Sequence, residues 1–247
     1  MKIFNLKTLL EEDNQPPYYT IPGLLPIGLI TLSGPRKVGK TWLTLKLAID
    51  ASQGNPVFGA FPCQPKRVFY YAYMNERGIP LFDRCLDLGL HTTMSGLGTH
   101  LSNCQNGTGI EIEICKRFNL KHIKKIIEED KTEILIIDSA DTLLNKRETL
   151  SDLNYLAWNN GVSIILTTTK KMAHIGLRMA SYLSEVDWTL SPSKTGELQL
   201  LRNGGEDETP ISLTISFSET FTEVLQGWGC KPVTIEVKGD HRCKHAN

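Results

Sequence analysis

The chain alternates short apolar runs with stretches in which apolar residues recur at helical spacing. Four apolar runs predict buried strands, at residues 29–32, 67–74, 133–138 and 162–166. Helical periodicity predicts helices at residues 40–52, 80–88, 118–130, 150–158 and 176–183. Strands that alternate with helices predict an α/β fold, with a central, mostly parallel sheet flanked by helices.

The pattern differs outside this alternation. Residues 4–12 predict a short amphipathic helix, which the adjacent Pro16 and Pro17 separate from the core. Residues 90–109 predict irregular structure with one strand near 99–103. Three further runs predict a C-terminal antiparallel β extension, at residues 186–190, 197–202 and 211–217. The expected organisation is an N-terminal helix and connector (1–19), a core (20–217) and a C-terminal tail (218–247).

Composition and charge narrow the class of protein. Of the 247 residues, 40% are hydrophobic and 22% are charged, as in ordinary globular domains. The 27 basic residues balance 27 acidic ones, so only a local basic patch would serve a nucleic-acid partner. No apolar run approaches the roughly 20 residues of a membrane span, so we expect no membrane partner. Six cysteines without a C-x-x-C pair, and no signal-peptide pattern, predict a cytoplasmic protein.

Residues 34–41 read Gly-Pro-Arg-Lys-Val-Gly-Lys-Thr, which fits the phosphate-binding pattern G-x-x-x-x-G-K-[ST]. A predicted strand precedes the motif and a predicted helix follows it. The glycines let backbone N–H groups turn toward phosphate oxygens, and the helix N-terminus adds positive potential. Lys40 is expected to reach the β- and γ-phosphates of ATP, and the Thr41 hydroxyl to ligate Mg²⁺. The predicted nucleotide-binding residues are Gly34, Pro35, Arg36, Lys37, Val38, Gly39, Lys40, Thr41 and Trp42.

Asp138 supplies a second acidic element for the same site. It ends the apolar run at 133–138, and the carboxyl ends of parallel strands are where α/β folds bind their ligands. A carboxylate there would hold Mg²⁺ through water, beside the phosphate-binding loop. Buried strands often end in aspartate, so it is the pairing with residues 34–41 that predicts a metal site formed by Thr41 and Asp138.

Several segments suggest a family. Residues 134–144, Ile-Leu-Ile-Ile-Asp-Ser-Ala-Asp-Thr-Leu-Leu, resemble the corresponding segment of RecA-like recombinases. Residues 24–30, 62–70 and 201–204 are similar to the RepA and DnaB replicative-helicase branch of these AAA-type P-loop ATPases. The resemblance spans residues 20–217 and implies a RecA-like core with ATP between neighbouring subunits of a homo-oligomer. It also implies that Arg202 of the next subunit touches the γ-phosphate; the alternative is a solvated hairpin arginine.

The chain departs from that family where hydrolysis would be catalysed. RecA-like ATPases carry a glutamate just after the strand that follows the phosphate-loop helix, and a general base must accept a proton. Alignment from Val68 puts Met74 at this position, and Glu76 reaches it only if two extra residues are allowed. After the strand at 162–166 the helicase branch tends to carry a polar residue, often histidine or glutamine, where this chain has Thr167, Thr168 and Thr169. A hydroxyl there could still donate to a γ-phosphate over a shorter reach, and strand propensity explains the three threonines equally well. The short connection between Asp138 and Val162 puts a hexamer in doubt.

A basic segment offers a surface for single-stranded DNA. No aspartate or glutamate occurs between Leu153 and Ser184, and this stretch carries Lys170, Lys171 and Arg178. Clustered cations on a loop suit a phosphate backbone, although the loop has no aromatic residue for base stacking. An exposed basic turn is the alternative.

Three functions remain open on the sequence alone. The first is a Mg–ATP-dependent ATPase that acts on DNA in replication, recombination or repair. The second, motivated by Met74, is a nucleotide-binding regulatory protein that hydrolyses ATP poorly and recruits a protein partner. The third is a small-molecule P-loop kinase, which the β-rich C-terminal section does not favour because it does not resemble a lid.

Overall fold

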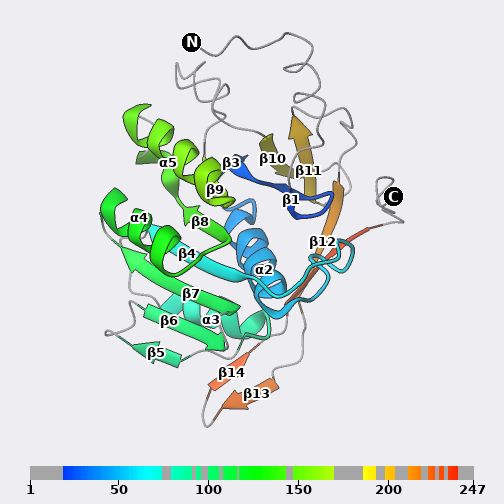
Figure 1. The fold of residues 1–247 in the computed structure, drawn as a ribbon. Coiled ribbons are helices and arrows are strands. Elements are labelled where there is room, and N and C mark those ends of the chain that lie inside the picture. Colours follow the sequence, from blue (N-terminus) through cyan, green and yellow to red (C-terminus); the bar gives the residue numbers. More distant parts are fainter. Residues whose placement is uncertain are drawn as a thin grey trace, which may run out of the picture.

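The described part of the chain forms an eleven-stranded sheet with helices on both faces (Figure 1). The structure is a computed structural model that describes residues 19–73, 79–90, 93–95, 100–105, 108–115, 117–142, 147–169, 186–192, 198–203, 211–217, 222–225, 228–230 and 233–238. No helix among these residues is long and apolar enough to span a membrane.

Six parallel strands form the middle of the sheet. In spatial order they are β10 (Val186–Pro192), β3 (Gly28–Ser33), β9 (Ser163–Thr168), β8 (Ile134–Asp138), β4 (Arg67–Tyr73) and β7 (Thr108–Cys115). Every residue of β3, β8 and β9 is buried, as expected for apolar runs covered on both faces. Because neighbouring strands run in parallel, the carboxyl ends of β3, β9, β8 and β4 meet at one edge of the sheet.

Antiparallel strands extend the sheet at both sides. Beyond β7 lie β6 (His100–Gln105) and β5 (Thr93–Ser95); beyond β10 lie β11 (Leu198–Asn203), β12 (Ile211–Phe217) and β15 (Val233–Val237). Two separate hairpins pair β1 (Tyr19–Ile21) with β2 (Leu25–Pro26), and β13 (Thr222–Leu225) with β14 (Trp228–Cys230).

Two apolar cores separate the sheet from its helices. One core includes residues of α2 (Lys40–Gln53) and α3 (Ile79–Asp87), and the other includes residues of α4 (Leu120–Glu129) and α5 (Arg147–Asn160). Side chains of β4 alternate between them: Val68, Tyr70 and Ala72 belong to the first core, and Phe69 and Tyr71 to the second. A short 3₁₀ helix, η2 (Ala140–Thr142), follows β8.

The predicted fold class is confirmed, with differences in detail. The sequence analysis left residues 110–115 unassigned, yet they form most of β7, because Ile110, Ile112 and Ile114 alternate with glutamates. The run at 186–190 was expected in the antiparallel extension, but β10 pairs in parallel with β3 and belongs to the central sheet. β15 lies in the segment assigned to the tail and pairs with β12. The predicted helices at 4–12 and 176–183 lie outside the described residues.

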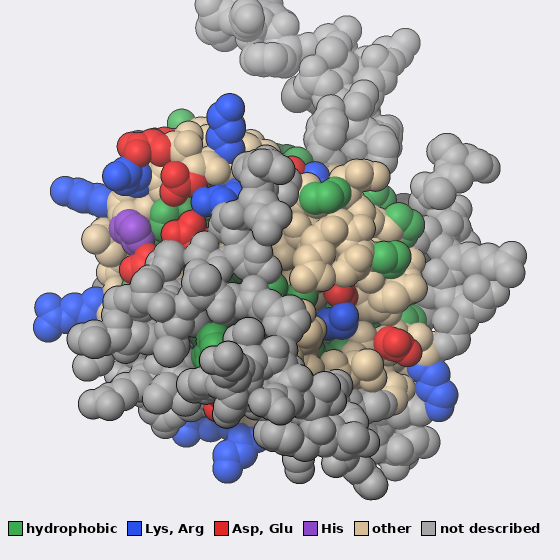
Figure 2. Space-filling view, turned by 90° about the horizontal axis from the view of Figure 1, so that it is seen from below, with side chains coloured by type: hydrophobic (Ala, Val, Ile, Leu, Met, Phe, Trp, Pro, Cys, Tyr) green, Lys and Arg blue, Asp and Glu red, His purple; other side chains and the backbone are tan. Residues whose placement is uncertain are grey.

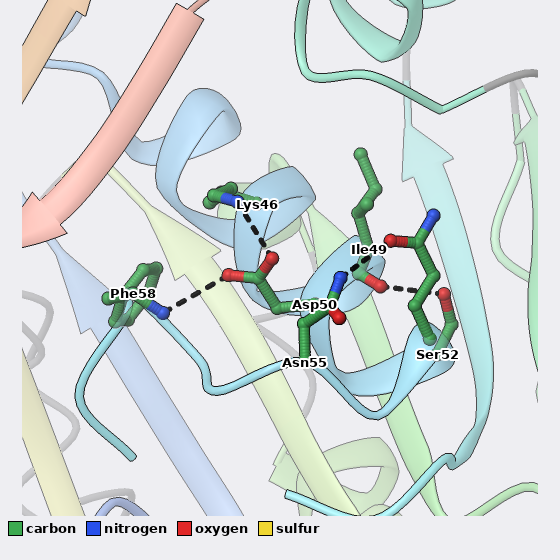
Figure 3. Close-up of polar contacts among 7 residues, drawn as sticks. Lys46, Ile49, Asp50, Ser52, Asn55 and Phe58 are labelled. Atoms are coloured by element: carbon green, nitrogen blue, oxygen red, sulfur yellow. Dashed lines mark hydrogen bonds and ion pairs between the residues drawn. The ribbon is translucent and has the colours of Figure 1, made fainter. Parts of the chain in front are cut away.

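Asp50 fastens the C-terminal end of α2 to the loop that follows (Figure 3). This buried carboxylate pairs with Lys46 Nζ at 2.7 Å and accepts the Phe58 backbone N–H at 3.1 Å. The Phe58 carbonyl in turn accepts the N–H of Val237 in β15 at 3.0 Å. Burial raises the pKa of Asp50, while the Lys46 and Phe58 contacts act to lower it. The net rise shows that these contacts do not fully offset the desolvation of the charge.

The charged surface seen from below carries both signs (Figure 2). On α4, Lys124 lies 3.7 Å from Glu128 and Lys125 lies 3.6 Å from Glu129, so the lysines alternate with partners one turn away. Along α4, this interleaving of opposite charges forms no purely basic stripe of the kind that would suit nucleic acid.

We expect Asp50→Ala to lower the free energy of unfolding by about 1–3 kcal/mol, because the buried Phe58 N–H loses its acceptor. Asp50→Asn keeps an acceptor oxygen for the Phe58 N–H and should cost clearly less. Urea unfolding of both variants measures the difference, with Glu128→Ala on exposed α4 as the control that stays near wild type. Equal losses for Asp50→Asn and Asp50→Ala would instead assign the stabilisation to the ion pair.

Candidate functional site

The loop at 34–41 connects β3 to α2 and is shaped as an anion cradle. Lys37 and Gly39 adopt left-handed backbone angles, with φ of 63° and 106°, which turn the chain sharply before the helix. No side chain caps the N-terminus of α2, whose Ncap is Gly39. The first N–H groups of a helix need an acceptor, and a phosphate supplies one together with charge that the helix dipole favours.

The sheet holds the start of the loop tightly. The Gly34 N–H donates to the Thr168 carbonyl of β9 at 3.3 Å. On the other side, a Cβ on Gly34 would lie 2.5 Å from the Leu190 carbonyl oxygen of β10. The Ser33 hydroxyl also donates to the Trp188 carbonyl at 3.3 Å. The close approach of the β10 backbone therefore requires glycine at position 34. This packing requirement is separate from the phosphate-binding pattern in which Gly34 also occurs.

Lys40 folds back over the loop. Its Nζ donates to the carbonyls of Gly34 at 2.7 Å and Pro35 at 2.8 Å. Partial burial lowers the pKa of Lys40, while the negative charges of Asp138 and Asp141 act to raise it. Both hydrogen-bond acceptors are neutral, so a phosphate in the loop would give this ammonium the anionic partner that favours its charged form.

Asp138 is the centre of a hydroxyl network at the carboxyl edge of the sheet. Its side chain is 2% exposed. Oδ2 accepts the Thr41 hydroxyl at 2.9 Å and the Tyr70 hydroxyl at 3.0 Å, and Oδ1 accepts the Thr167 hydroxyl. The network joins α2, β4, β8 and β9, and it brings Thr41 and Asp138 together as the sequence analysis expected.

Tyr70 is fully buried, and its hydroxyl contacts a second residue of the phosphate-loop helix. The Thr44 Oγ1 lies 3.0 Å from Tyr70 Oη and 3.0 Å from the Lys40 carbonyl. Burial raises the pKa of Tyr70 well above its ordinary value, and the charge of Asp138 raises it further. The phenol therefore keeps its proton and remains a hydrogen-bond donor.

The donor set around Asp138 fits magnesium held through water. A carboxylate has about four lone-pair sites, and three of those on Asp138 already accept hydroxyl groups. The remaining site suits a water on the metal, and Mg²⁺ usually keeps several waters. No group of three or more His, Cys, Asp and Glu side chains gathers among the described residues. Thr41, metal-bound water and nucleotide phosphates would therefore complete the coordination of Mg²⁺.

The end of β9 is bound to the segment after β8. The Thr167 hydroxyl accepts the Ser139 N–H at 2.8 Å, and Ser139 adopts φ of 64°. Asp141 Oδ1 accepts both the N–H and the hydroxyl of Thr169, at 2.8 and 2.9 Å. The Thr167 hydroxyl, considered in the sequence analysis for γ-phosphate contact, is thus bound to Asp138 and the backbone. Residues 167–169 fix the position of η2 relative to β9.

The other predicted site residues are distributed as follows. Arg202 pairs with Trp188 in β11, within the strand predicted at residues 197–202. Trp42 lies in the first turn of α2, and the Arg84 guanidinium of α3 lies 5.9 Å from its ring centroid. Met74 and Glu76, and the basic residues Lys170, Lys171 and Arg178, lie outside the described residues.

The sequence analysis missed Tyr70, Thr44 and Asp141 at this site. Tyr70 lies in an aromatic run that strand propensity explains, and Thr44 lies among apolar helix positions. In the structure, Tyr70 lies on the same face of β4 as Ala72, and Ala72 pairs with Asp138. Using this relation to find Tyr70 would have required the order of the strands, which the sequence did not supply.

Comparisons with known proteins agree with this geometry. Residues 5–153 match the family described as AAA domain. No curated protein matches the chain. A KaiC-like protein from the hyperthermophilic archaeon Pyrococcus horikoshii has a similar structure, with TM-score 0.58, 17% identity, and coverage of 91% of this chain and 99% of that one. The flagellar accessory protein FlaH from Methanocaldococcus jannaschii is also similar, with TM-score 0.57, 12% identity, and coverage of 89% and 93%. These likenesses confirm the predicted RecA-like fold.

We expect Gly34→Ala to weaken nucleotide binding at least about tenfold, since the new Cβ would collide with backbone that cannot rotate away. Fluorescent ADP titration measures the loss. Gly89→Ala is the control: Gly89 has φ of +82° and no atom within 4 Å of an added Cβ, so that variant bears backbone strain without a collision. Wild-type affinity in Gly34→Ala would contradict the packing of β10 against the loop.

Proposed function

This chain belongs to the AAA domain family and has the fold of the RecA-like P-loop ATPases, and from that premise we propose that it is a Mg–ATP-dependent ATPase. One observation carries the proposal: the hydroxyl of Thr41, in the phosphate-binding motif, donates to the buried carboxylate of Asp138 at 2.9 Å. A hydroxyl and a carboxylate in contact beside an uncapped helix N-terminus form the arrangement needed to hold Mg²⁺ and phosphates.

Each residue has a distinct role in this proposal. Backbone N–H groups of residues 36–41 bind the phosphates, and Lys40 exchanges its two carbonyl partners for phosphate oxygens. Thr41 and Asp138 hold the metal, directly and through water. Bound Mg²⁺ would neutralise the charge that develops on the phosphates during transfer. Arg202 of a neighbouring subunit is proposed to contact the γ-phosphate, which requires a homo-oligomer.

The attacking water needs a base, and we assign this role to Glu76. β4 ends at Tyr73 beside β8, so the chain leaves the sheet at the edge that carries Asp138. Glu76 follows three residues later and can accept a proton, whereas the Met74 thioether cannot. The alternative rests on Met74: if it occupies the base position, the protein binds ATP, hydrolyses it poorly and acts by recruiting a protein partner.

We further propose that single-stranded DNA binds the basic segment carrying Lys170, Lys171 and Arg178. The support is its attachment: Lys170 directly follows Thr169, whose N–H and hydroxyl both bind Asp141. A change in the segment after Asp138 would therefore reach the residue at which the basic segment begins. The mixed charge on α4 offers no competing basic surface there.

We expect the wild-type protein to hydrolyse ATP and single-stranded DNA to stimulate it, and Glu76→Gln to slow hydrolysis by about 10²–10⁴-fold without loss of ADP affinity. Single-turnover phosphate release, with and without DNA, measures both effects. Lys40→Ala should abolish binding and turnover together, and Lys125→Ala on exposed α4 should leave both unchanged.

The same assay separates the two functions. Absence of turnover in the wild type, with ADP binding retained and hydrolysis appearing in Met74→Glu, would contradict the ATPase proposal and support the regulatory one. If the protein hydrolyses ATP but DNA neither binds it nor stimulates hydrolysis at low salt, only the proposed DNA partner is contradicted.

A further inference from the structure

We propose that Tyr70 is a positioning residue for the magnesium site, holding Asp138 in place through its hydroxyl while Thr44 ties it to the phosphate-loop helix. The inference rests on the proposed function and deepens it, because it names a residue through which α2 helps to hold the Asp138 carboxylate. Neither the phosphate-binding motif nor the acidic strand includes Tyr70 or Thr44.

The strand register explains why a tyrosine at this position reaches Asp138. On the neighbouring strands, Tyr70 pairs with Ile136 and Ala72 pairs with Asp138. Tyr70 therefore starts two residues, roughly 6.6 Å, before the carboxylate along the sheet, and its side chain shares the α2 face with Ala72. A phenol is long enough to cover this distance, and its oxygen lies 3.0 Å from Asp138 Oδ2.

Counting protons fixes the direction of the bond to Asp138. Oδ2 of a carboxylate only accepts, so the single Tyr70 proton points to Asp138. The Tyr70 oxygen is then free to accept, and the Thr44 hydroxyl lies 3.0 Å away. The same Thr44 hydroxyl also donates to the backbone of its own helix, to the Lys40 carbonyl at 3.0 Å and the Thr41 carbonyl at 3.3 Å. These contacts form a chain from the α2 backbone through Thr44 and Tyr70 to Asp138.

This chain links two parts of the same metal site. Thr44 lies three residues, just under one helical turn, beyond Thr41 on α2, and Thr41 binds the same Oδ2 that Tyr70 binds. The Asp138 oxygen is therefore held from two positions on one helix, directly by Thr41 and indirectly by Thr44. Removing the Tyr70 hydroxyl leaves Asp138 attached to α2 by Thr41 alone, whose oxygen is also the proposed metal ligand.

Tyr71 offers a matched control on the same strand. It is as buried as Tyr70, but it faces the opposite core, and its hydroxyl donates to the Arg117 carbonyl at 2.7 Å. Tyr70→Phe and Tyr71→Phe each remove one buried hydroxyl from adjacent positions of β4: the first loses the contacts to Asp138 and Thr44, and the second loses the bond to the Arg117 carbonyl. A general loss of stability would affect both variants, whereas a change in the Mg²⁺ requirement should appear only in Tyr70→Phe.

The test measures the Mg²⁺ concentration that half-saturates binding of a fluorescent ADP, beside thermal unfolding without nucleotide. Loss of an outer-shell partner typically weakens metal binding about 10–100-fold, so we expect at least about a tenfold rise for Tyr70→Phe. Tyr71→Phe should stay within about twofold of wild type in its Mg²⁺ requirement, even though it also loses a hydrogen bond and should unfold at a lower temperature. Thr44→Val should raise the Mg²⁺ requirement in the same direction by a smaller factor.

The outcomes keep the inference separate from the proposed function. Equal Mg²⁺ requirements in Tyr70→Phe and Tyr71→Phe, with Mg²⁺-dependent ADP binding by the wild type, would overturn the role of Tyr70 and leave the ATP site intact. Failure of the wild type to bind ADP with Mg²⁺ would instead overturn the proposed function on which the inference rests.

Discussion

The burial of the Asp138 carboxylate is the constraint on which the site depends. A carboxylate that is 2% exposed requires hydrogen-bond donors, because removing it from water is costly unless its oxygens are satisfied. Three hydroxyl groups meet this need, from Thr41, Tyr70 and Thr167. Since they come from α2, β4 and β9, satisfying one buried group fixes three elements relative to β8. The position of the phosphate-binding loop is therefore linked to the interior of the sheet.

The parallel sheet makes this network possible. Its strand order places β3, β9, β8 and β4 side by side, so their carboxyl ends bring together residues that are distant along the chain. The loop at 34–41 is also held from both sides, by the Thr168 carbonyl of β9 and by close packing of the Leu190 carbonyl of β10. A loop fixed in this way can present its N–H groups to phosphate with little reorganisation, which favours binding.

The sequence predicted the parts of the site that depend on local pattern. Residues 34–41 and Asp138 follow from glycine spacing and from an apolar run that ends in a carboxylate, and both lie where they were expected. Tyr70 and Thr44 could not be predicted, because a buried tyrosine in an aromatic strand looks the same whether or not its hydroxyl meets a carboxylate across the sheet. β7 was missed although isoleucines alternate along it. The antiparallel pairing expected of β10 is present with β11, but its parallel pairing with β3 was not predicted, since its own residues do not encode which second neighbour it joins. Arg202 lies in β11, within the strand that the sequence predicted.

The central claim is that Asp138 and the phosphate-binding loop form one magnesium-dependent nucleotide site. Calorimetric titration of ADP into wild type and Asp138→Asn, each with Mg²⁺ and with EDTA, tests it most directly. The account predicts that Mg²⁺ strengthens binding to the wild type by about tenfold or more, and that this gain largely disappears in Asp138→Asn, which retains the metal-independent affinity. An equal gain from Mg²⁺ in both proteins would contradict the claim.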